Sequence, residues 1–583
     1  MILRTARSAA LLVTLLTTAF AAWGNDIYVS AARGSDKNSG ASPSEPLATI
    51  AAASKRATPG DNVYLVAGQY NEPIIPVRSG TKDHPITYQS YGGRAVISNV
   101  NVGILVSSQA YLTFNGISVN GTNPPPNATV NSWVAIQNSS NIIVRNGTFK
   151  YANGWGGIDI SGRYIPDGRF WANYAAAAVG GTSSYVRIED NTLDYVGDYS
   201  KPSGNVIQVE YGRVQHILIQ RNTITHGGHN LVEFDSDYGV LQDNILNNSY
   251  HDTVGGDTGY RSLEVQGSYN IVQRNFMAHA RLGGGGYVAP IASVRGNQNI
   301  VRQNVMFDGI RSGIVTWCGD SASTVTTARI YNNTFDQIGG EGWSVWVYTG
   351  CDTMGNFVFA NNLVANSRAN PGTLPGVRSA GGAIMDADLV FVPVTPGSSR
   401  QPGPTVQSIV KGNVFAPKTP EPAYVMLMDA DGRIPLSVAA TRYPELFVKN
   451  QEARPRFVGA NPSAAADFQL APGSPGRGTG VFLTQAVGSG TSNVLRVQDS
   501  LYFSDGNGVV PGDMIQLQGT TGTAQILSID RKSNTLTLGS PVTFRDGQGV
   551  ALPYSASAPD VGVDLASPAA VRPMPPSNVS IGH

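Results

Sequence analysis

Histidine and carboxylate side chains gather in one stretch of this chain. Five of its seven histidines fall between residues 216 and 279, together with Glu233, Asp235 and Glu264. Imidazole groups titrate near neutral pH, so a cluster of histidines suits proton transfer. A lone histidine is more often a satisfied core or surface residue, but five within one short stretch favour function. Carboxylates beside them suit acid or base catalysis, or the binding of a hard cation.

A recurring phrase containing Asn must position these side chains. It occurs at Asn146, Asn191, Asn222, Asn244, Asn275, Asn304, Asn333, Asn362 and Asn413. Each phrase alternates apolar and polar residues with the period of a β-strand, and Asn tolerates the left-handed backbone of a turn. Most spacings lie between 22 and 31 residues. Strand, turn and strand therefore repeat as the coils of a solenoid that stacks its Asn side chains in a ladder.

Aligning the coils on their Asn predicts which side chains lie side by side. One predicted column contains Asn205, Asn230 and Arg261, and a second contains Gln208, Glu233 and Glu264. Carboxylates stacked about 4.8 Å apart repel each other unless a cation lies between them. We therefore predict that Ca²⁺ binds to Gln208, Glu233, Asp235 and Glu264. The alternative is a solvated acidic strip paired with Arg261.

Candidate site residues follow from the same alignment. The predicted catalytic residues are His229, His251, Tyr260 and Arg261. The predicted substrate-binding residues are Asn205, Asn230, His226, His279, Arg281, Arg311 and Trp171. Trp171 belongs to an aromatic-rich insertion between Asn146 and Asn191, whose rings would stack on sugars if exposed. The alternative is that these rings pack the insertion onto the solenoid.

Composition and the two ends of the chain indicate its compartment. Lys+Arg and Asp+Glu both number 40, so no overall field attracts nucleic acid. Arg4 and Arg7, an apolar run and small residues predict a signal peptide at 1–24, and a secreted or periplasmic monomer without a membrane span. Two cysteines in an exported chain, Cys318 and Cys351, predict one disulfide, the alternative being two free thiols.

The domain organisation follows from where the repeat stops. The solenoid is predicted to span 25–480, with a helical cap at 46–58. Short alternating strands predict a small β-barrel module at 481–556, and a closing strand and tail follow at 557–583.

The N-terminal passage carries a resemblance to known proteins. IYVSAARGSDKNSGASPSEPLATIAAA, followed by GDNVYLVAGQYNEPIIPVRSGTKDHPITYQSYGGRAVIS, resembles the start of bacterial right-handed parallel β-helix polysaccharide lyases. These include chondroitinase B with its alginate-lyase relatives, and the pectate lyases. The resemblance implies an all-β right-handed parallel β-helix that cleaves a uronate-containing acidic polysaccharide by β-elimination. It also implies calcium held by an acidic pair, here Glu233 and Asp235.

The chain differs from these lyases in the residue available as the catalytic base. They use a Lys, and no Lys stands between Lys201 and Lys411. β-Elimination requires neutralisation of the uronate carboxylate, a base for the C5 proton and an acid for the leaving oxygen. Ca²⁺ or Arg261 suits the first role, and the predicted histidines and tyrosine suit the others. Three alternatives remain open: a glycoside hydrolase using Glu233 and Glu264 or Asp257, a uronate epimerase and a noncatalytic glycan-binding surface protein.

Overall fold

The computed structural model describes most of the chain. The described residues are 24–124, 127–154, 156–162, 180–197, 204–210, 212–247, 261–279, 291–309, 312–316, 327–338, 343–348, 357–367, 387–392, 408–418, 421–427, 432–462 and 464–564. Both cysteines and almost all of the predicted signal peptide lie outside these residues, so the disulfide and the leader stay predictions. No helix within the described ranges is long and apolar enough to cross a membrane.

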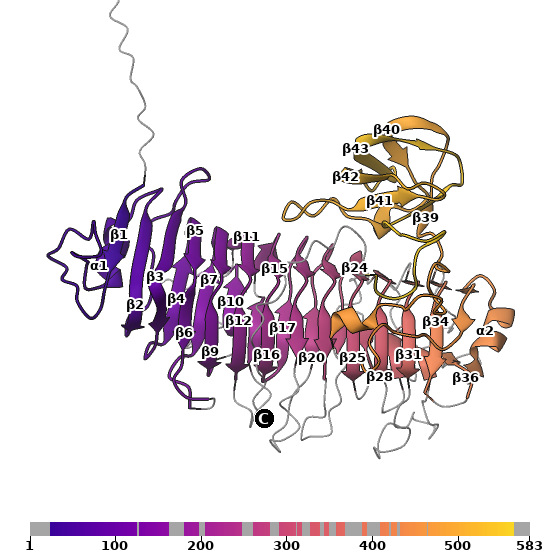
Figure 1. Ribbon diagram of the computed structural model, residues 1–583, viewed down its shortest axis with the longest axis horizontal. Helices are drawn as coiled ribbons and strands as arrows, with labels where there is room; N and C mark the ends of the chain where they lie inside the picture. The colour runs from indigo at the N-terminus through magenta and orange to yellow at the C-terminus, as the bar shows by residue number, and fades with distance from the viewer. Residues whose placement is uncertain are drawn as a thin grey trace, which may run out of the picture.

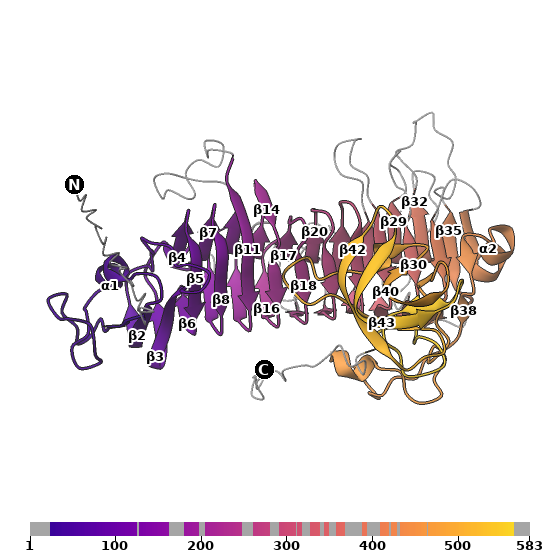
Figure 2. The ribbon, with the colours of Figure 1, turned by 90° about the horizontal axis from the view of Figure 1, so that it is seen from above.

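Parallel strands stack along one axis as a right-handed parallel β-helix, as predicted (Figures 1 and 2). Each coil has three faces, named in chain order. The first face is a twelve-stranded sheet of β4 (Val102–Ser107), β7 (Ser132–Gln137), β10 (Gly156–Ser161), β13 (Asn205–Val209), β17 (Asn230–Phe234), β20 (Arg261–Val265), β23 (Ala292–Val294), β26 (Ile314–Thr316), β29 (Trp343–Tyr348), β32 (Ala387–Val392), β35 (Tyr424–Leu427) and β36 (Gly432–Pro435). Of its pairings, only that between β35 and β36 is antiparallel.

The other two faces belong to one 26-stranded sheet, joined where β3 pairs with strands of both. The second face contains β1 (Asp26–Val29), β2 (Asn62–Tyr70), β3 (Ile86–Ile97), β5 (Ala110–Asn115), β8 (Ser140–Arg145), β11 (Thr182–Glu189), β14 (Arg213–Gln215), β15 (Leu218–Gln220), β18 (Val240–Gln242), β21 (Ile271–Gln273), β24 (Asn299–Arg302), β27 (Ala328–Tyr331), β30 (Val358–Ala360), β33 (Ile409–Lys411) and β37 (Phe447–Val448). The third face contains β6 (Ile117–Asn120), β9 (Thr148–Ala152), β12 (Thr192–Val196), β16 (Thr223–Gly227), β19 (Ile245–Asn247), β22 (Phe276–Ala278), β25 (Val305–Gly309), β28 (Thr334–Ile338), β31 (Leu363–Ser367), β34 (Val414–Pro417) and β38 (Gln451–Glu452).

An asparagine ladder marks the turn between the second and third faces. The side-chain Nδ2 of Asn222 donates to Oδ1 of Asn244 on the next coil at 3.0 Å, and the same bond repeats from Asn244 to Asn275 at 3.0 Å. The ladder runs from Asn191 to Asn450. Each bond satisfies a buried amide, so the ladder holds successive coils in register.

Two details of the predicted ladder are wrong. In the first phrase the ladder position is Gly147, whose backbone N donates to Asn191 Oδ1 at 2.8 Å, and Asn146 stands one residue earlier. The left-handed residue of each turn is also the one before the ladder Asn, such as Arg221 at φ 54° or Asp243 at φ 57°. The ladder position therefore selects Asn for its amide and not for its backbone freedom.

Short helices lie near both ends of the β-helix. Thr49 caps α1 (Ile50–Arg56), whose Ile50 and Ala53 are buried in the core beside β1 and β2 (Figure 1). At the other end, α2 (Leu436–Arg442) buries Leu436 and Ala439. The 3-10 helix η3 (Ala465–Phe468) places Phe468 against Phe276 and Phe307 of the third face.

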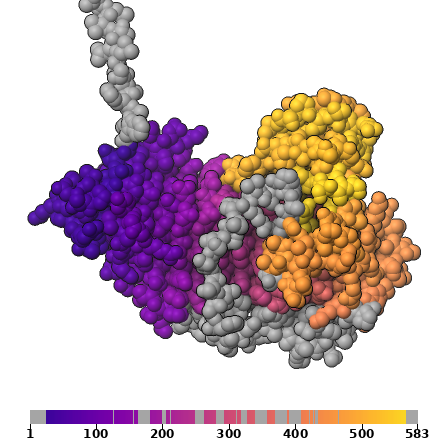
Figure 3. Space-filling model, viewed as in Figure 1, coloured from indigo at the N-terminus to yellow at the C-terminus, as the bar shows by residue number. Residues whose placement is uncertain are grey.

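Six antiparallel strands form a module within the predicted 481–556. They are β39 (Thr484–Gln485), β40 (Gly490–Arg496), β41 (Met514–Leu517), β42 (Thr523–Asp530), β43 (Thr535–Phe544) and β44 (Gly549–Ala551), with a 3-10 turn, η4 (Ser500–Tyr502). A bridge between Ala486 and Val497 joins the two edge strands, so the sheet closes on itself. The module stands on the second face of the helix (Figure 3). Its status as a separate domain stays a prediction.

Apolar and polar columns on the outside of the second face hold this module. Leu218, Val240 and Ile271 lie in register and are buried under Val509 and Val510 of the module. Arg302 is 2% exposed and forms two hydrogen bonds with Asp513, at 2.5 and 2.7 Å. A buried arginine with a bidentate partner fixes orientation as well as contact.

A ladder of glutamine side chains connects Arg302 by hydrogen bonds to Glu189, four coils away. Gln220 donates to Glu189 at 2.8 Å, Gln242 donates to Gln220 at 2.9 Å, and Gln273 donates to Gln242 at 2.8 Å. Arg302 then donates to Gln273 Oε1 at 2.7 Å. Every amide thus points the same way, from the donor Arg302 toward the acceptor Glu189.

Candidate functional site

A polar column runs across five strands of the first face, on its outer side. Asp159 on β10, Gln208 on β13, Glu233 on β17, Glu264 on β20 and Ser293 on β23 lie in register. The predicted stacking of the three central residues is confirmed. All five residues are at most 8% exposed, so they do not form a solvated strip, whereas the pairing with Arg261 that the alternative predicted is found at Glu264.

Two arginines donate hydrogen bonds to the carboxylate of Glu264. Arg261 NH1 donates to Oε2, and Arg295 NH2 donates to Oε1 at 2.8 Å. Arg261 lies in register with Asn230, as predicted. Glu264 is 3% exposed, so its charge is compensated by guanidinium groups and not by water.

Two side-chain amides donate hydrogen bonds to the carboxylate of Glu233. Asn205 Nδ2 donates to Oε2 at 2.5 Å, and Gln266 Nε2 donates to Oε1 at 2.9 Å. Burial, together with the charges of Glu210 and Glu264, raises the pKa of Glu233 to about 8. The Asn205 hydrogen bond opposes this rise but does not cancel it, so Glu233 keeps its proton to a higher pH than an ordinary carboxyl group and suits the role of a general acid.

Asp159 is the most unusual group of the column. It is 1% exposed, and both carboxylate oxygens are without a hydrogen-bond partner in the described part of the chain. Burial and the charges of Glu210 and Glu233 raise its pKa to about 8. Gln208, its neighbour in register, donates Nε2 to Glu210 at 2.6 Å, and its buried Oε1 has no partner among the described residues.

His229 lies immediately before β17, beside the column. Burial and the nearby charge of Arg261 lower the pKa of its imidazole, while Glu264 opposes the shift. Its Nδ1 lies 3.3 Å from Asn205 Oδ1 and 3.1 Å from Asn230 Nδ2. His229 is therefore neutral at physiological pH, the form that accepts a proton.

The other two described histidines of the predicted set lie along the third face. His226, on β16, contacts Asp194 at 2.5 Å and stacks on Tyr195 with ring centroids 4.2 Å apart. His279, just after β22, contacts Asp308 at 2.8 Å. A substrate-binding role for either histidine stays a prediction.

Several predicted residues lie outside the described part of the chain. They are His251, Tyr260, Arg281, Arg311 and Trp171. Asn205 and Asn230 are described and buried, and they contact each other, His229 and Glu233.

Sequence reasoning missed four polar neighbours of the column. They are Asp159, Glu210, Gln266 and Arg295. The phrase GGIDI at 156–160 aligns with NVIQV at 205–209 and marks Asp159 as the partner of Gln208. The long insertion after residue 161 changes the number of residues between Asp159 and the ladder Asn of its coil. Alignment on the ladder Asn therefore does not find this match.

Two of the four predicted calcium ligands are hydrogen-bonded to other side chains through both carboxylate oxygens, and calcium binding stays a prediction. Guanidinium groups hold both oxygens of Glu264, and amides hold both oxygens of Glu233. Among the residues that the structure describes, no three His, Cys, Asp or Glu side chains are grouped to hold a metal ion. Burial and the charge of Asp237 raise the pKa of Asp235 to about 6.

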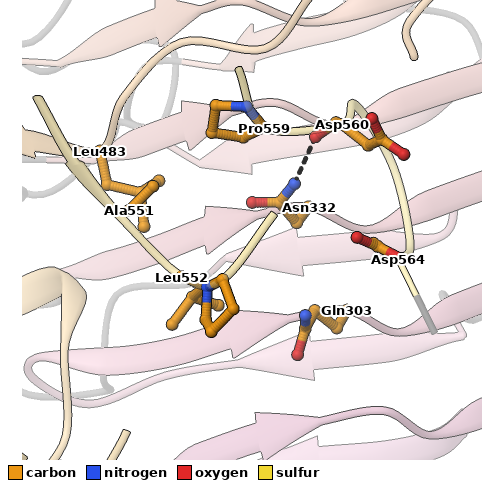
Figure 4. A pocket seen from close by; sticks show the side chains of 9 residues that line it. Gln303, Asn332, Leu483, Ala551, Leu552, Pro559, Asp560 and Asp564 are labelled. Carbon is orange, nitrogen blue, oxygen red and sulfur yellow. Dashed lines mark hydrogen bonds between the residues drawn. The ribbon is translucent and has the colours of Figure 1, made fainter. Parts of the chain in front are cut away.

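A small pocket lies elsewhere, where the chain returns from the module to the helix (Figure 4). Gln303 and Asn332 line it from the turns of the ladder, and Leu483 lines it from the segment leading into the module. Asn332 Nδ2 donates to the backbone oxygen of Asp560 at 2.7 Å. The column contributes no residue to this pocket, so the two sites are separate.

Comparisons with known proteins show similarity of fold. No family model matches the chain. The uncharacterized protein YwoF of Bacillus subtilis (strain 168) is 38% identical over 74 residues, which is 13% of this chain and 15% of that protein's length.

Several solved β-helices are similar to this chain. A GH136 lacto-N-biosidase from Eubacterium ramulus is 15% identical, with 63% of this chain and 67% of that chain covered and a TM-score of 0.45. Pectate lyase Pel9A is 14% identical, with 80% and 94% covered and a TM-score of 0.42. An alginate lyase from Paenibacillus sp. str. FPU-7 is 16% identical, with 55% and 98% covered and a TM-score of 0.39. At these identities the likeness concerns the fold alone.

Proposed function

We propose that this protein is an exported polysaccharide lyase that cleaves a uronate-containing acidic polysaccharide by β-elimination. The supporting observation is His229, a neutral imidazole beside the guanidinium of Arg261 on the outer side of the first face. β-Elimination requires these two functions side by side, because the C5 proton becomes acidic only when the uronate carboxylate is neutralised.

Each proposed step uses a group of the column. Arg261, while it keeps its bond to Glu264, binds the uronate carboxylate through its other N–H groups, and His229 takes the C5 proton. The electron pair of the C5–H bond forms the C4–C5 double bond as the C4–O bond breaks. Glu233, which keeps its proton to a higher pH than an ordinary carboxyl group, gives that proton to the leaving oxygen. His251 and Tyr260 remain predicted partners in proton transfer.

The test is an ultraviolet assay for the conjugated uronate alkene. Purified protein is mixed with a panel of acidic polysaccharides, and absorbance of the unsaturated product is followed. We expect one substrate to give a rising signal that His229→Gln abolishes. His84→Gln is the matched control, because His84 is exposed on an N-terminal coil. A flat trace across the panel contradicts the proposal.

A glycoside hydrolase is the second candidate. Glu233 and Glu264 lie in register on neighbouring strands, and their environments differ, with amides around one and arginines around the other. Two close carboxyl groups in unlike environments suit an acid and a nucleophile. Release of reducing ends without an ultraviolet chromophore, lost in both Glu233→Gln and Glu264→Gln, favours this candidate.

Calcium has no step in this mechanism. Its predicted ligands Glu233 and Glu264 are already bonded to other side chains. Parallel calcium and chelator arms of the absorbance assay therefore test the cofactor separately, and we expect less than about a twofold change in rate.

A further inference from the structure

We infer that Asn205 is a positioning residue that holds His229 in the tautomer with its proton on Nδ1, which leaves the lone pair on Nε2. The tautomer follows from the contacts that Asn205 and Asn230 make with Nδ1. Its consequence for proton abstraction rests on the proposed lyase function.

The orientation of the Asn205 amide is fixed by the backbone. Its Oδ1 lies 3.0 Å from the backbone N of Asn230, and a backbone N–H can only donate, so an oxygen must stand there. The other end of the amide is then Nδ2, which donates to Glu233 Oε2 at 2.5 Å. Asn205 is 3% exposed, and both ends of its amide are used.

This orientation decides which form of His229 is favourable. Asn205 Oδ1 lies 3.3 Å from His229 Nδ1, and a carbonyl oxygen can only accept. A proton on Nδ1 makes this contact a hydrogen bond, whereas a lone pair on Nδ1 makes it repulsive. Asn205 therefore favours the Nδ1–H tautomer.

Asn230 favours the opposite tautomer in its present orientation. Its Nδ2 lies 3.1 Å from His229 Nδ1 and would donate to a lone pair there. The buried Oδ1 of Asn230 has no partner in the described part of the chain, so nothing described here locks that amide against rotation. Once rotated, Asn230 places Oδ1 toward Nδ1–H as a second acceptor. The locked amide of Asn205 therefore sets the tautomer.

The same amide links the proposed base to the proposed acid. One end of Asn205 orients His229, and the other end donates to Glu233, a hydrogen bond that lowers the pKa of that carboxyl against its burial. Replacing Asn205 by Ala removes both effects at once. It frees the imidazole to change tautomer and raises the pKa of Glu233 further.

Nitrogen NMR of the full chain tests the inference without substrate. Protein labelled with ¹⁵N-histidine is compared with His229→Gln to assign the His229 signals, and long-range proton–nitrogen correlations report which nitrogen carries the proton. We expect Nδ1–H in the wild type and a mixture, or mainly Nε2–H, in Asn205→Ala. Asn99→Ala, at an exposed asparagine on an N-terminal coil, should leave the His229 signals unchanged.

Two outcomes overturn the inference. One is Nε2–H in the wild type, which makes Asn230 the controlling neighbour. The other is an unchanged tautomer in Asn205→Ala.

Asn205→Asp is a second variant for the same NMR experiment. The added anion beside His229 should raise the pKa of the imidazole by about 1 to 3 units. These measurements stand even if no polysaccharide is cleaved. If one is cleaved, Asn205→Ala should lower kcat and leave KM nearly unchanged.

Discussion

Asp159→Asn tests the electrostatics of the column most directly. A carboxyl whose pKa is raised on folding binds its proton more tightly in the folded state, so the free energy of unfolding falls as pH rises from the unfolded pKa to the folded one. For Asp159 this window runs from 3.8 to about 8. The wild type should therefore lose stability across this range, and the Asn variant should lose less.

The size of the effect follows from the shift. About 1.4 kcal/mol per pKa unit gives an upper bound of about 6 kcal/mol at alkaline pH. Asp159 and Glu233 repel each other, and removing one charge relieves the other, so we expect about half of this bound. For a chain of this size, 1 kcal/mol corresponds to about 1 °C in Tm. The difference in Tm between variant and wild type should thus grow by about 2–3 °C.

Thermal melts at about pH 4, 6 and 9 measure this difference. The new amide is itself buried and adds an offset that does not depend on pH, so only the change of the difference with pH counts. A difference that stays constant refutes the reasoning, because the charge of Asp159 would then be compensated in the folded protein. Gln208→Glu is the converse variant. It adds a carboxylate between Asp159 and Glu233, and its loss of Tm should grow with pH.

Three further variants test other contacts. Arg302→Met leaves the partly buried carboxylate of Asp513 without its arginine partner and should cost about 3 kcal/mol. Limited proteolysis of the module should accelerate, and Asp513→Leu in the same chain should restore part of the loss. Asn275→Ala removes five side-chain hydrogen bonds of the ladder, three donated and two accepted, and should cost about 2–4 kcal/mol in urea unfolding, with no change in the His229 signals. Glu264→Gln removes an anion that raises the pKa of His229, so an NMR titration should find that pKa lower still.

The column was predictable because the ladder fixes the phase of each coil. Glu233 and Glu264 stand the same number of residues before their ladder Asn, and parallel strands in register keep that offset. Asp159 was not predicted to belong to the column, because an insertion separates it from its own ladder position. No repeat constrains the length of such insertions, so counting along the chain fails there.

The contacts of each carboxylate were not predictable in the same way. The sequence alignment pairs Glu264 with Glu233, but it does not show that Arg295, from the corner after β23, reaches back to Glu264. That reach depends on how strand ends turn from the first face to the second. The calcium prediction did not foresee these arginines, which lie beside one of the four side chains assigned to the ion.

The footprint of the module on the β-helix limits how this protein can gain or lose coils. Duplicating a coil between His216 and Arg302 would move His216 about 4.8 Å along the axis from Asn507 of the module, while Arg302 would keep Asp513. The module also contacts the helix at His216 and Lys411, so its footprint spans a fixed count of coils. Coils that precede Glu189 carry no such restriction. Length variation among descendants of this chain should therefore be concentrated in the N-terminal coils and in the loops, while the coils under the module keep their number.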